Sequence, residues 1–246
     1  MRFKLFGLLG VLAVALSGVA HGVGNQTRQI DNVYDIYLGG IWIAEMKIDA
    51  EIGRLNYRAA AALQTKGIVA VLYKASFEAE AEGRVVQDRL ATSHFMADSR
   101  SKKKNQFVEV RYRNGRPDGL KAVPEFDPRP WEIDPKAQSN TADPLSAALG
   151  ALTPAPGTPL CNRQVDVFDG RKRYAVKMMA PEEVNGLIRC QAVYKRIGGF
   201  KPKHMAKPDY PLTLWFEPTA EGGHRIQKAV GDTPIGVAVI RQRKES

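Results

Sequence analysis

Short runs of alternating apolar and polar residues cover most of this 246-residue chain, and turn-forming dipeptides separate them. Alternation is typical of a β-strand with one buried face, because successive side chains point to opposite sides of a sheet. The stretch VYDIYLGGIWIAEMKID, residues 33–49, therefore predicts two strands joined at Gly39-Gly40. Further strands are predicted over residues 54–65, 75–97 with a turn at Glu82-Gly83, 106–114, 173–178, 187–194, 209–218, 222–230 and 235–243.

The chain shows neither an alternation of strands with helices nor an internal repeat. We therefore predict a mainly β fold: an antiparallel, strongly curved sheet, or an open barrel or β-spiral, of roughly a dozen strands with one or two short helices. Residues 59–65 and 79–83 place many alanines on strands, which favours a groove over the alternative, close packing of a helix.

Two segments interrupt the strands. Residues 123–142 are rich in proline and lack periodicity, which predicts a loop. Residues 143–152 predict a short helix, because Asp143 suits the N-cap and Pro144 the first helical position. The stretch GIVAVLYKAS, residues 67–76, is compatible with a helix or a buried strand, and we favour a helical turn that leads into a strand.

The first residues resemble a secretory signal. Arg2 and Lys4 precede an apolar run, and Gly18 and Ala20 have the spacing of a cleavage site, so residues 1–20 predict a cleaved signal peptide. An uncleaved anchor is the alternative, although the run is shorter than a spanning helix needs. We expect a periplasmic protein with a single β-rich domain over residues 21–246. Cleavage would lower the net charge from +10 to +8. The remaining positive charge favours anionic partners.

Cys161 and Cys190 are the only cysteines, and two cysteines in an exported chain favour a disulfide. The scattered histidines do not supply a zinc site, so we expect no metal and no cofactor. A turn at Asp169-Gly170 would place the cysteines on strands that flank a third, too far apart to bond. Either Cys161 lies in a loop that folds across the sheet, or the strand order differs.

Several short motifs resemble a known family. They are YDIYLGGIWIA (34–44), DPLS (143–146), FDGRKRY (168–174), CQAVYKRIGGF (190–200), PLTLWF (211–216) and IGVAV (235–239). In this order they resemble the bacterial family called domain of unknown function 3108. The resemblance implies an exported β protein of the Gram-negative cell envelope, without catalytic residues to carry over. More distantly, the chain is similar to β-spiral envelope-integrity proteins of alphaproteobacteria, which carry a disulfide.

The sequence carries no catalytic motif that we recognise, so we expect no enzymatic activity. There is no nucleophile elbow, and Ser93 and His94, as neighbours on a strand, point to opposite faces. Glu78, Glu80 and Glu82 share one face of a strand, which is more typical of a solvated surface than of an acid–base pair.

Basic residues cluster in turns. We expect Lys102, Lys103 and Lys104, at a hairpin tip, and Arg171, Lys172 and Arg173, after another turn, to form an anionic docking surface if their tips share one rim. Lys195-Arg196 and residues 201–207 are also basic. Trp131, in the proline-rich loop, would plug one end of the barrel or line a ligand mouth, and we favour the plug.

These features favour a non-enzymatic envelope protein that supports envelope integrity by binding an apolar or amphipathic ligand in its curved sheet. The alternative is a structural envelope protein with a packed core, and an unrecognised hydrolase ranks last. The expected partners are lipid, lipopolysaccharide, peptidoglycan or an envelope protein, with peripheral membrane association and no nucleic acid.

Overall fold

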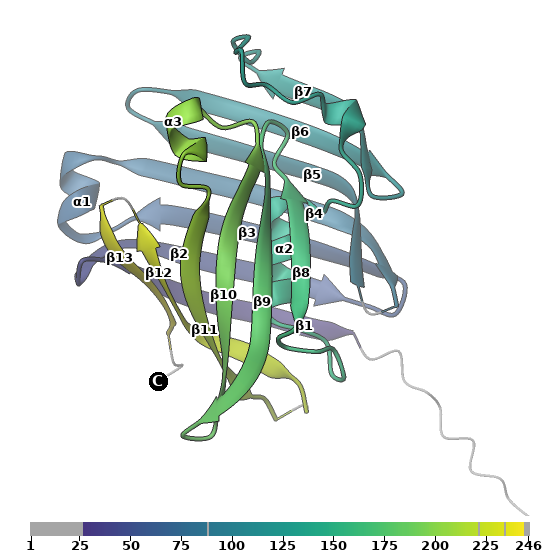
Figure 1. Ribbon diagram of the computed structural model, residues 1–246, viewed down its shortest axis with the longest axis vertical. Helices are drawn as coiled ribbons and strands as arrows, with labels where there is room; N and C mark the ends of the chain where they lie inside the picture. Colours follow the sequence, from purple (N-terminus) through teal and green to yellow (C-terminus); the bar gives the residue numbers. More distant parts are fainter. Residues whose placement is uncertain (1–26, 88, 221, 234, 244–246) are drawn as a thin grey trace, which may run out of the picture.

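The computed structural model describes residues 27–87, 89–220, 222–233 and 235–243 (Figure 1). The segment predicted as a signal peptide, residues 1–20, lies outside the described residues. The strands within them are β1 (Arg28–Leu38), β2 (Ile41–Ile52), β3 (Asn56–Thr65), β4 (Ala75–Val86), β5 (Arg89–Ser101), β6 (Asn105–Arg113), β7 (Arg116–Val123), β8 (Arg163–Phe168), β9 (Arg173–Val184), β10 (Leu187–Gly198), β11 (Asp209–Pro218), β12 (His224–Thr233) and β13 (Gly236–Gln242). The helices are α1 (Gly67–Leu72), η1 (Pro135–Ala137), α2 (Pro144–Leu152) and α3 (Pro202–Met205).

All thirteen strands of the described residues belong to one sheet, in the order β7-β6-β5-β4-β3-β2-β1-β13-β12-β11-β10-β9-β8. Every neighbouring pair in this order is antiparallel. Figure 1 shows β1 to β7 crossing behind β8 to β13, so the sheet curves strongly while its edge strands β7 and β8 stay unpaired with each other. The predicted fold class, a curved and open antiparallel sheet, is confirmed.

Glycine and asparagine fix several of the hairpins. Gly39, Gly40, Asn114, Gly115 and Asn185 all have positive φ, a backbone region that glycine and asparagine tolerate best. The turn predicted at Gly39-Gly40 is therefore confirmed, and Asn114-Gly115 and Asn185 likewise lie between consecutive strands.

The turn predicted at Glu82-Gly83 is wrong. Strand β4 continues through both residues to Val86, and its register with β5 shifts at this point. A side chain at Gly83 would collide with the backbone of β5, since a Cβ there would lie 2.1 Å from the carbonyl oxygen of Ala91. The glycine thus permits a β-bulge with close strand approach, and does not end the strand.

Helix α2 lies against the inner face of the curved sheet, where it packs on β3, β4, β5 and β8 (Figure 1). Asp143 caps it as predicted, by accepting hydrogen bonds from the backbone N–H groups of Leu145 and Ser146. The side chains of Leu145 and Leu149 are buried in the main core.

Small residues on the strands make room for this helix. Ala59, Ala79 and Ala81 point inward and are buried in the same core cluster as Leu145 and Leu149. Of the two interpretations that the alanine-rich strands left open, close helix packing applies to the inner face.

The connection between β7 and β8 contacts both edge strands, since η1 packs on β7 and α2 packs on β8. Strand β7 itself was not predicted, and the loop that follows it is held by Arg171, whose guanidinium binds Glu132 at 2.6 Å and the carbonyl oxygen of Asp127. Further along, Ala142 pairs with Val167 in a parallel bridge on the edge of β8. Trp131 is half-buried in this loop, and its role as a plug or as a ligand mouth stays a prediction.

Candidate functional site

Apart from the long β7–β8 connection, each connection between consecutive strands lies at one of the two ends of the sheet, because every pair of neighbours is antiparallel. One end carries, in the order of the sheet, the β5–β6 loop, α1, the β1–β2 turn, the β12–β13 turn, the β10–β11 connection with α3, and the β8–β9 turn. We call this end the loop rim. All the basic turns singled out in the sequence lie on it.

Lys102, Lys103 and Lys104 form the exposed tip of the β5–β6 hairpin. Ser101 holds the tip in shape, because its hydroxyl accepts hydrogen bonds from the backbone N–H groups of Lys103 and Lys104. None of these hydrogen bonds uses a lysine side chain, so the three lysine charges are exposed to solvent. Their role in docking stays a prediction.

The second basic group has mainly internal contacts. Arg171 pairs with Glu132 and lies over the ring of Phe126, with 4.5 Å from its guanidinium carbon to the ring centroid. Arg173 pairs with Asp166 at 3.3 Å. Both side chains therefore hold the proline-rich loop and the β8 edge in place. Lys172 points instead towards the β10–β11 connection.

Basic and aromatic side chains stack around that connection. The ammonium nitrogen of Lys172 lies 5.7 Å from the ring centroid of Phe200, and the guanidinium of Arg196 lies 4.5 Å from that of Tyr210. The pKa of His204 is lowered by desolvation and by repulsion from Arg196 and nearby lysines, which include Lys172. A positive potential therefore extends from the β8–β9 turn to α3.

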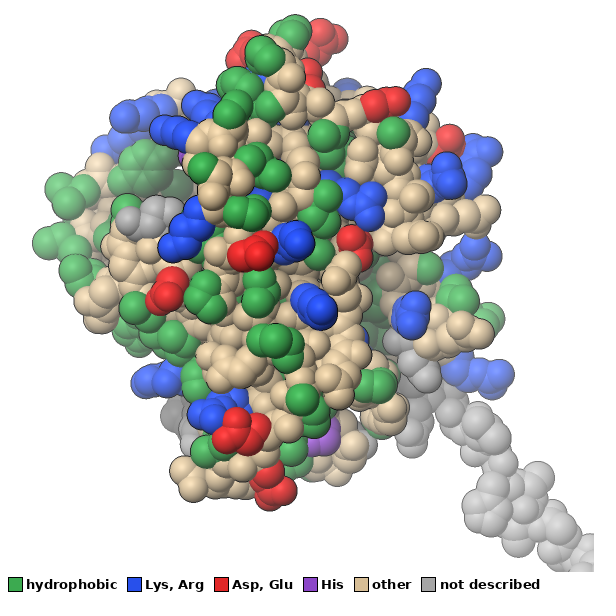
Figure 2. All heavy atoms as spheres, viewed as in Figure 1, with side chains coloured by type: hydrophobic (Ala, Val, Ile, Leu, Met, Phe, Trp, Pro, Cys, Tyr) green, Lys and Arg blue, Asp and Glu red, His purple; other side chains and the backbone are tan. Residues whose placement is uncertain are grey.

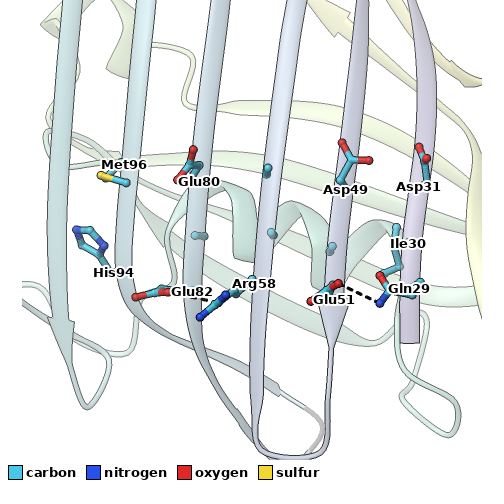
Figure 3. A pocket seen from close by; sticks show the side chains of 14 residues that line it. Gln29, Ile30, Asp31, Asp49, Glu51, Arg58, Glu80, Glu82, His94 and Met96 are labelled. Carbon is cyan, nitrogen blue, oxygen red and sulfur yellow. Dashed lines mark hydrogen bonds and ion pairs between the residues drawn. The ribbon is translucent and has the colours of Figure 1, made fainter. Parts of the chain in front are cut away.

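The outer face of the sheet carries a separate hollow of about 760 Å³ over β1 to β5 (Figure 3). Its floor contains Ala60, whose small side chain is flanked on the neighbouring strands by Asp49 and Glu80. The outward side chains that line it are Gln29, Asp31, Asp49, Glu51, Arg58, Ala60, Glu80, Glu82, His94 and Met96.

Ion pairs within the sheet offset part of the acidity of this hollow. Lys47 lies 3.0 Å from Asp49 and 3.7 Å from Asp31, and Arg58 lies 3.9 Å from Glu82. His94 turns away to contact the carboxylate of Glu109 at 3.0 Å. The prediction that Glu78, Glu80 and Glu82 share one exposed strand face is thus confirmed, and the cross-strand Arg58 accompanies Glu82.

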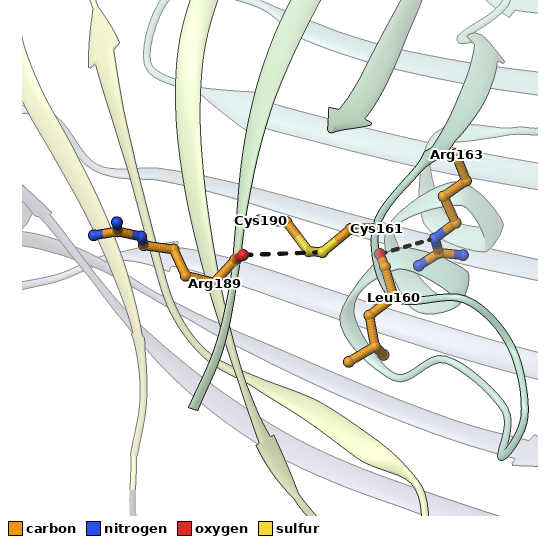
Figure 4. Close-up of a disulfide and its surroundings, with 5 residues drawn as sticks. All are labelled: Leu160, Cys161, Arg163, Arg189 and Cys190. Atoms are coloured by element: carbon orange, nitrogen blue, oxygen red, sulfur yellow. Dashed lines mark hydrogen bonds between the residues drawn. A yellow bond between two sulfur atoms is a disulfide. The ribbon is translucent and has the colours of Figure 1, made fainter. Parts of the chain in front are cut away.

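Cys161 and Cys190 form a disulfide, with 5.7 Å between their Cα atoms (Figure 4). Cys161 lies in the loop just before β8, and Cys190 lies on β10, so the bond crosses the inner face of the intervening β9. The predicted pairing is confirmed. Of the two ways to reconcile it with a hairpin at Asp169-Gly170, a loop that folds across the sheet is the one observed.

A buried polar cluster joins α2 to the sheet. The hydroxyl of Thr92 donates to the carboxylate of Asp143 at 2.5 Å, and the hydroxyls of Tyr57 and Ser146 lie 2.5 Å apart. Burial raises the pKa of Asp143, against the effect of the hydrogen bonds from Ser146 and Thr92. Burial, and secondarily the charge of Asp143, raises the pKa of Tyr57 to about 12. Satisfied hydrogen bonds around an N-cap indicate a structural role.

Two features are absent from the described part of the chain. It contains no group of three or more His, Cys, Asp or Glu side chains placed to hold a metal ion. None of its helices is long and apolar enough to cross a bilayer.

Sequence reasoning missed the hollow and the exposure of α1. The hollow depends on the alignment of Ala60 with residues on neighbouring strands, which requires the register. The residues of α1 are apolar, which favours burial, and only the strand order places them at an open end of the sheet.

One curved antiparallel sheet with a helix on its inner face defines a β-barrel-like protein. The chain belongs to the family described as Protein of unknown function (DUF3108), which matches residues 33–241. The family predicted from the motifs is thus confirmed. Among solved structures, the chain is similar to a β-barrel-like protein of domain of unknown function DUF1849 from Brucella abortus, with 10% identity, a TM-score of 0.44, and coverage of 88% of this chain and 96% of that one. A comparison with curated proteins found no match.

Proposed function

We propose that this protein is a non-enzymatic component of the periplasm that supports the cell envelope by docking its loop rim on an anionic surface. The observation that carries the proposal is the strand order, which gathers the basic turns at one end of the sheet. The disulfide is compatible with an oxidising compartment such as the periplasm. A one-sided positive surface favours association with phosphate-bearing envelope surfaces, and this attraction is screened by salt.

The rim is rich in lysine. The β10–β11 connection contributes Lys201, Lys203 and Lys207, and the β5–β6 tip contributes three more lysines. The acidic residues nearest to them in sequence are Asp209 and Asp98, and Asp98 pairs with Arg100. Docking through such a rim needs no catalytic group, in agreement with the lack of a recognisable catalytic motif in the sequence.

The hypothesis of an apolar ligand inside the sheet gains less support. Helix α2 and the core side chains occupy the inner face, so a ligand there would have to displace α2. The outer hollow is open but lined by charged side chains, which suit a polar ligand better than an apolar one. Ligand binding in the curved sheet stays a prediction.

The test is sedimentation with phosphatidylcholine vesicles that contain or lack phosphatidylglycerol, at low and high salt. We expect binding only to the anionic vesicles, with loss at high salt. The triple variant Lys102→Ala/Lys103→Ala/Lys104→Ala removes about 1 kcal/mol per lysine, or roughly a hundredfold in partition altogether.

The matched control removes three exposed arginines from the opposite end of the sheet, in the variant Arg54→Ala/Arg84→Ala/Arg89→Ala. Its net charge equals that of the lysine variant. If both variants bind equally weakly, net charge alone drives binding and the loop rim is not the docking surface. A lack of binding by the wild-type protein would contradict the proposal directly.

A further inference from the structure

Helix α1 is an apolar helix without a buried face. It consists of Gly67 followed by five apolar residues, and none of them is buried. The side chains of Val71 and Leu72 are 76% and 75% exposed. Two of the five apolar residues, Val69 and Ala70, are half-buried. Scattered apolar residues on a protein surface are ordinary, but an apolar helix with several neighbouring side chains exposed marks an interaction site.

Neighbouring turns extend this apolar surface. Gly67 packs against Trp42, since a Cβ at Gly67 would lie 3.0 Å from the Trp42 carbonyl oxygen. The β1–β2 turn is joined in turn to β13, where the N–H of Gly39 donates to the carbonyl oxygen of Val237 at 2.9 Å. The exposed side chains that these contacts bring together form what we call the apolar tip: Ile41, Trp42, Ile68, Val71, Leu72 and Ile235.

Basic segments flank the apolar tip on both sides along the loop rim. The β5–β6 loop with its three lysines follows α1 in the order of the sheet, and the lysine-rich β10–β11 connection follows the β12–β13 turn. Figure 2 shows hydrophobic side chains gathered at the left edge, where Figure 1 shows α1 and the ends of β12 and β13, with Lys and Arg side chains above them.

We infer that the apolar tip inserts into the outer layer of an anionic phospholipid bilayer while the flanking lysines contact lipid phosphates. Charge complementarity favours lipid over a second copy of this chain, whose own rim would carry the same positive charge. Trp42 and the exposed Tyr73 add the aromatic side chains that are enriched at membrane interfaces. This inference rests on the proposed function, because it identifies the anionic surface as a lipid leaflet.

The first experiment compares two double variants that each replace one exposed leucine and one exposed valine. Val71→Ser/Leu72→Ser alters the apolar tip, whereas Leu55→Ser/Val86→Ser alters the opposite end of the sheet, where the side chains are 70% and 48% exposed. We expect the first variant to lose roughly a hundredfold in partition to phosphatidylglycerol-containing vesicles, about tenfold per side chain, and the second to bind as the wild type does.

The second experiment measures how deeply Trp42 enters the bilayer. Brominated phosphatidylcholine in the same vesicles should quench the tryptophan fluorescence of the wild-type protein, and most of this quenching should disappear in Trp42→Phe. Thermal unfolding of each variant verifies that it is folded.

The outcomes separate insertion from docking. If the lysine variant binds weakly while Val71→Ser/Leu72→Ser binds normally and Trp42 is not quenched, docking stands and insertion is overturned. If Val71→Ser/Leu72→Ser instead abolishes a dimer in sedimentation equilibrium and leaves vesicle binding unchanged, the apolar tip is a contact between copies and insertion is again overturned. If the wild-type protein binds no vesicles, both proposals fail.

Discussion

Helices α1 and α2 are both short and rich in apolar residues, yet α1 has no buried residue whereas α2 packs in the core. Helix α2 has a side-chain cap, Asp143, and buries Leu145, Ser146, Ala147 and Leu149, whereas α1 has no side-chain cap and buries nothing. Short helices depend on tertiary packing for their stability. The difference teaches that apolar composition alone does not assign a segment to the core, and that its position in the strand order does.

The largest effect on the free energy of unfolding is expected for the disulfide between Cys161 and Cys190. Replacing the disulfide in Cys161→Ala/Cys190→Ala should lower the free energy of unfolding by roughly 3.5 kcal/mol, because a loop of this length then regains its freedom in the unfolded chain. Urea unfolding of the two proteins measures the difference. It should shrink markedly when both are compared in reductant, and if it does not, the cost lies in packing rather than in the bond.

The next test compares the cost of replacing one leucine in each helix, Leu149 in α2 and Leu72 in α1. Leu149→Ala should cost about 3 kcal/mol because the side chain is fully buried and its removal leaves a cavity. Leu72→Ala should cost less than about 0.5 kcal/mol because that side chain is exposed. Urea unfolding again provides the measurement, and equal costs for the two variants would mean that α1 packs against the fold after all.

An effect smaller than that of Leu149→Ala is expected at the cap of α2. Asp143→Ala should lower the free energy of unfolding by about 1–2 kcal/mol, since the N–H groups of Leu145 and Ser146 lose their acceptor. Asp143→Asn keeps an acceptor for them and should cost less.

The two cap variants also predict a pH dependence. Burial raises the pKa of Asp143, so the folded protein binds this proton more tightly than the unfolded chain does. The contribution of Asp143 to stability is thus complete below an unfolded pKa of about 3.9 and is lost as pH rises towards the folded pKa. Relative to the wild type, Asp143→Asn should therefore become more stable as pH rises through this window. If the difference in free energy of unfolding between Asp143→Asn and the wild type stays constant with pH, folding does not raise the pKa of Asp143.

Much of the fold could be predicted because local chemistry agrees with it. Gly39-Gly40 and Asn114-Gly115 take the positive φ angles that their residue types suggest, and Asp143-Pro144 begins a helix as such a pair should. Gly83 misled the prediction, because a glycine that permits a bulge looks in sequence like one that permits a turn.

The candidate site was harder to predict than the fold. The lysines of the β5–β6 tip were identified from sequence, but their place on the same rim as the basic β8–β9 turn depends on the long connection from Val123 to Arg163. That connection runs from one end of the sheet to the other, and neither β7 nor this crossing could be recognised from alternation alone. The exposure of α1 follows from the same global order.

The pairing of β1 with β13 has a consequence for how the molecule is assembled. These strands lie nearly at opposite ends of the chain, yet they form the central seam of the sheet. A nascent chain that still lacks β13 holds two separate meanders, each with an open inner edge exposed to unwanted strand pairing. Strand β13, which pairs with both β1 and β12, therefore joins the two halves, and its removal would disrupt the middle of the sheet rather than its edge.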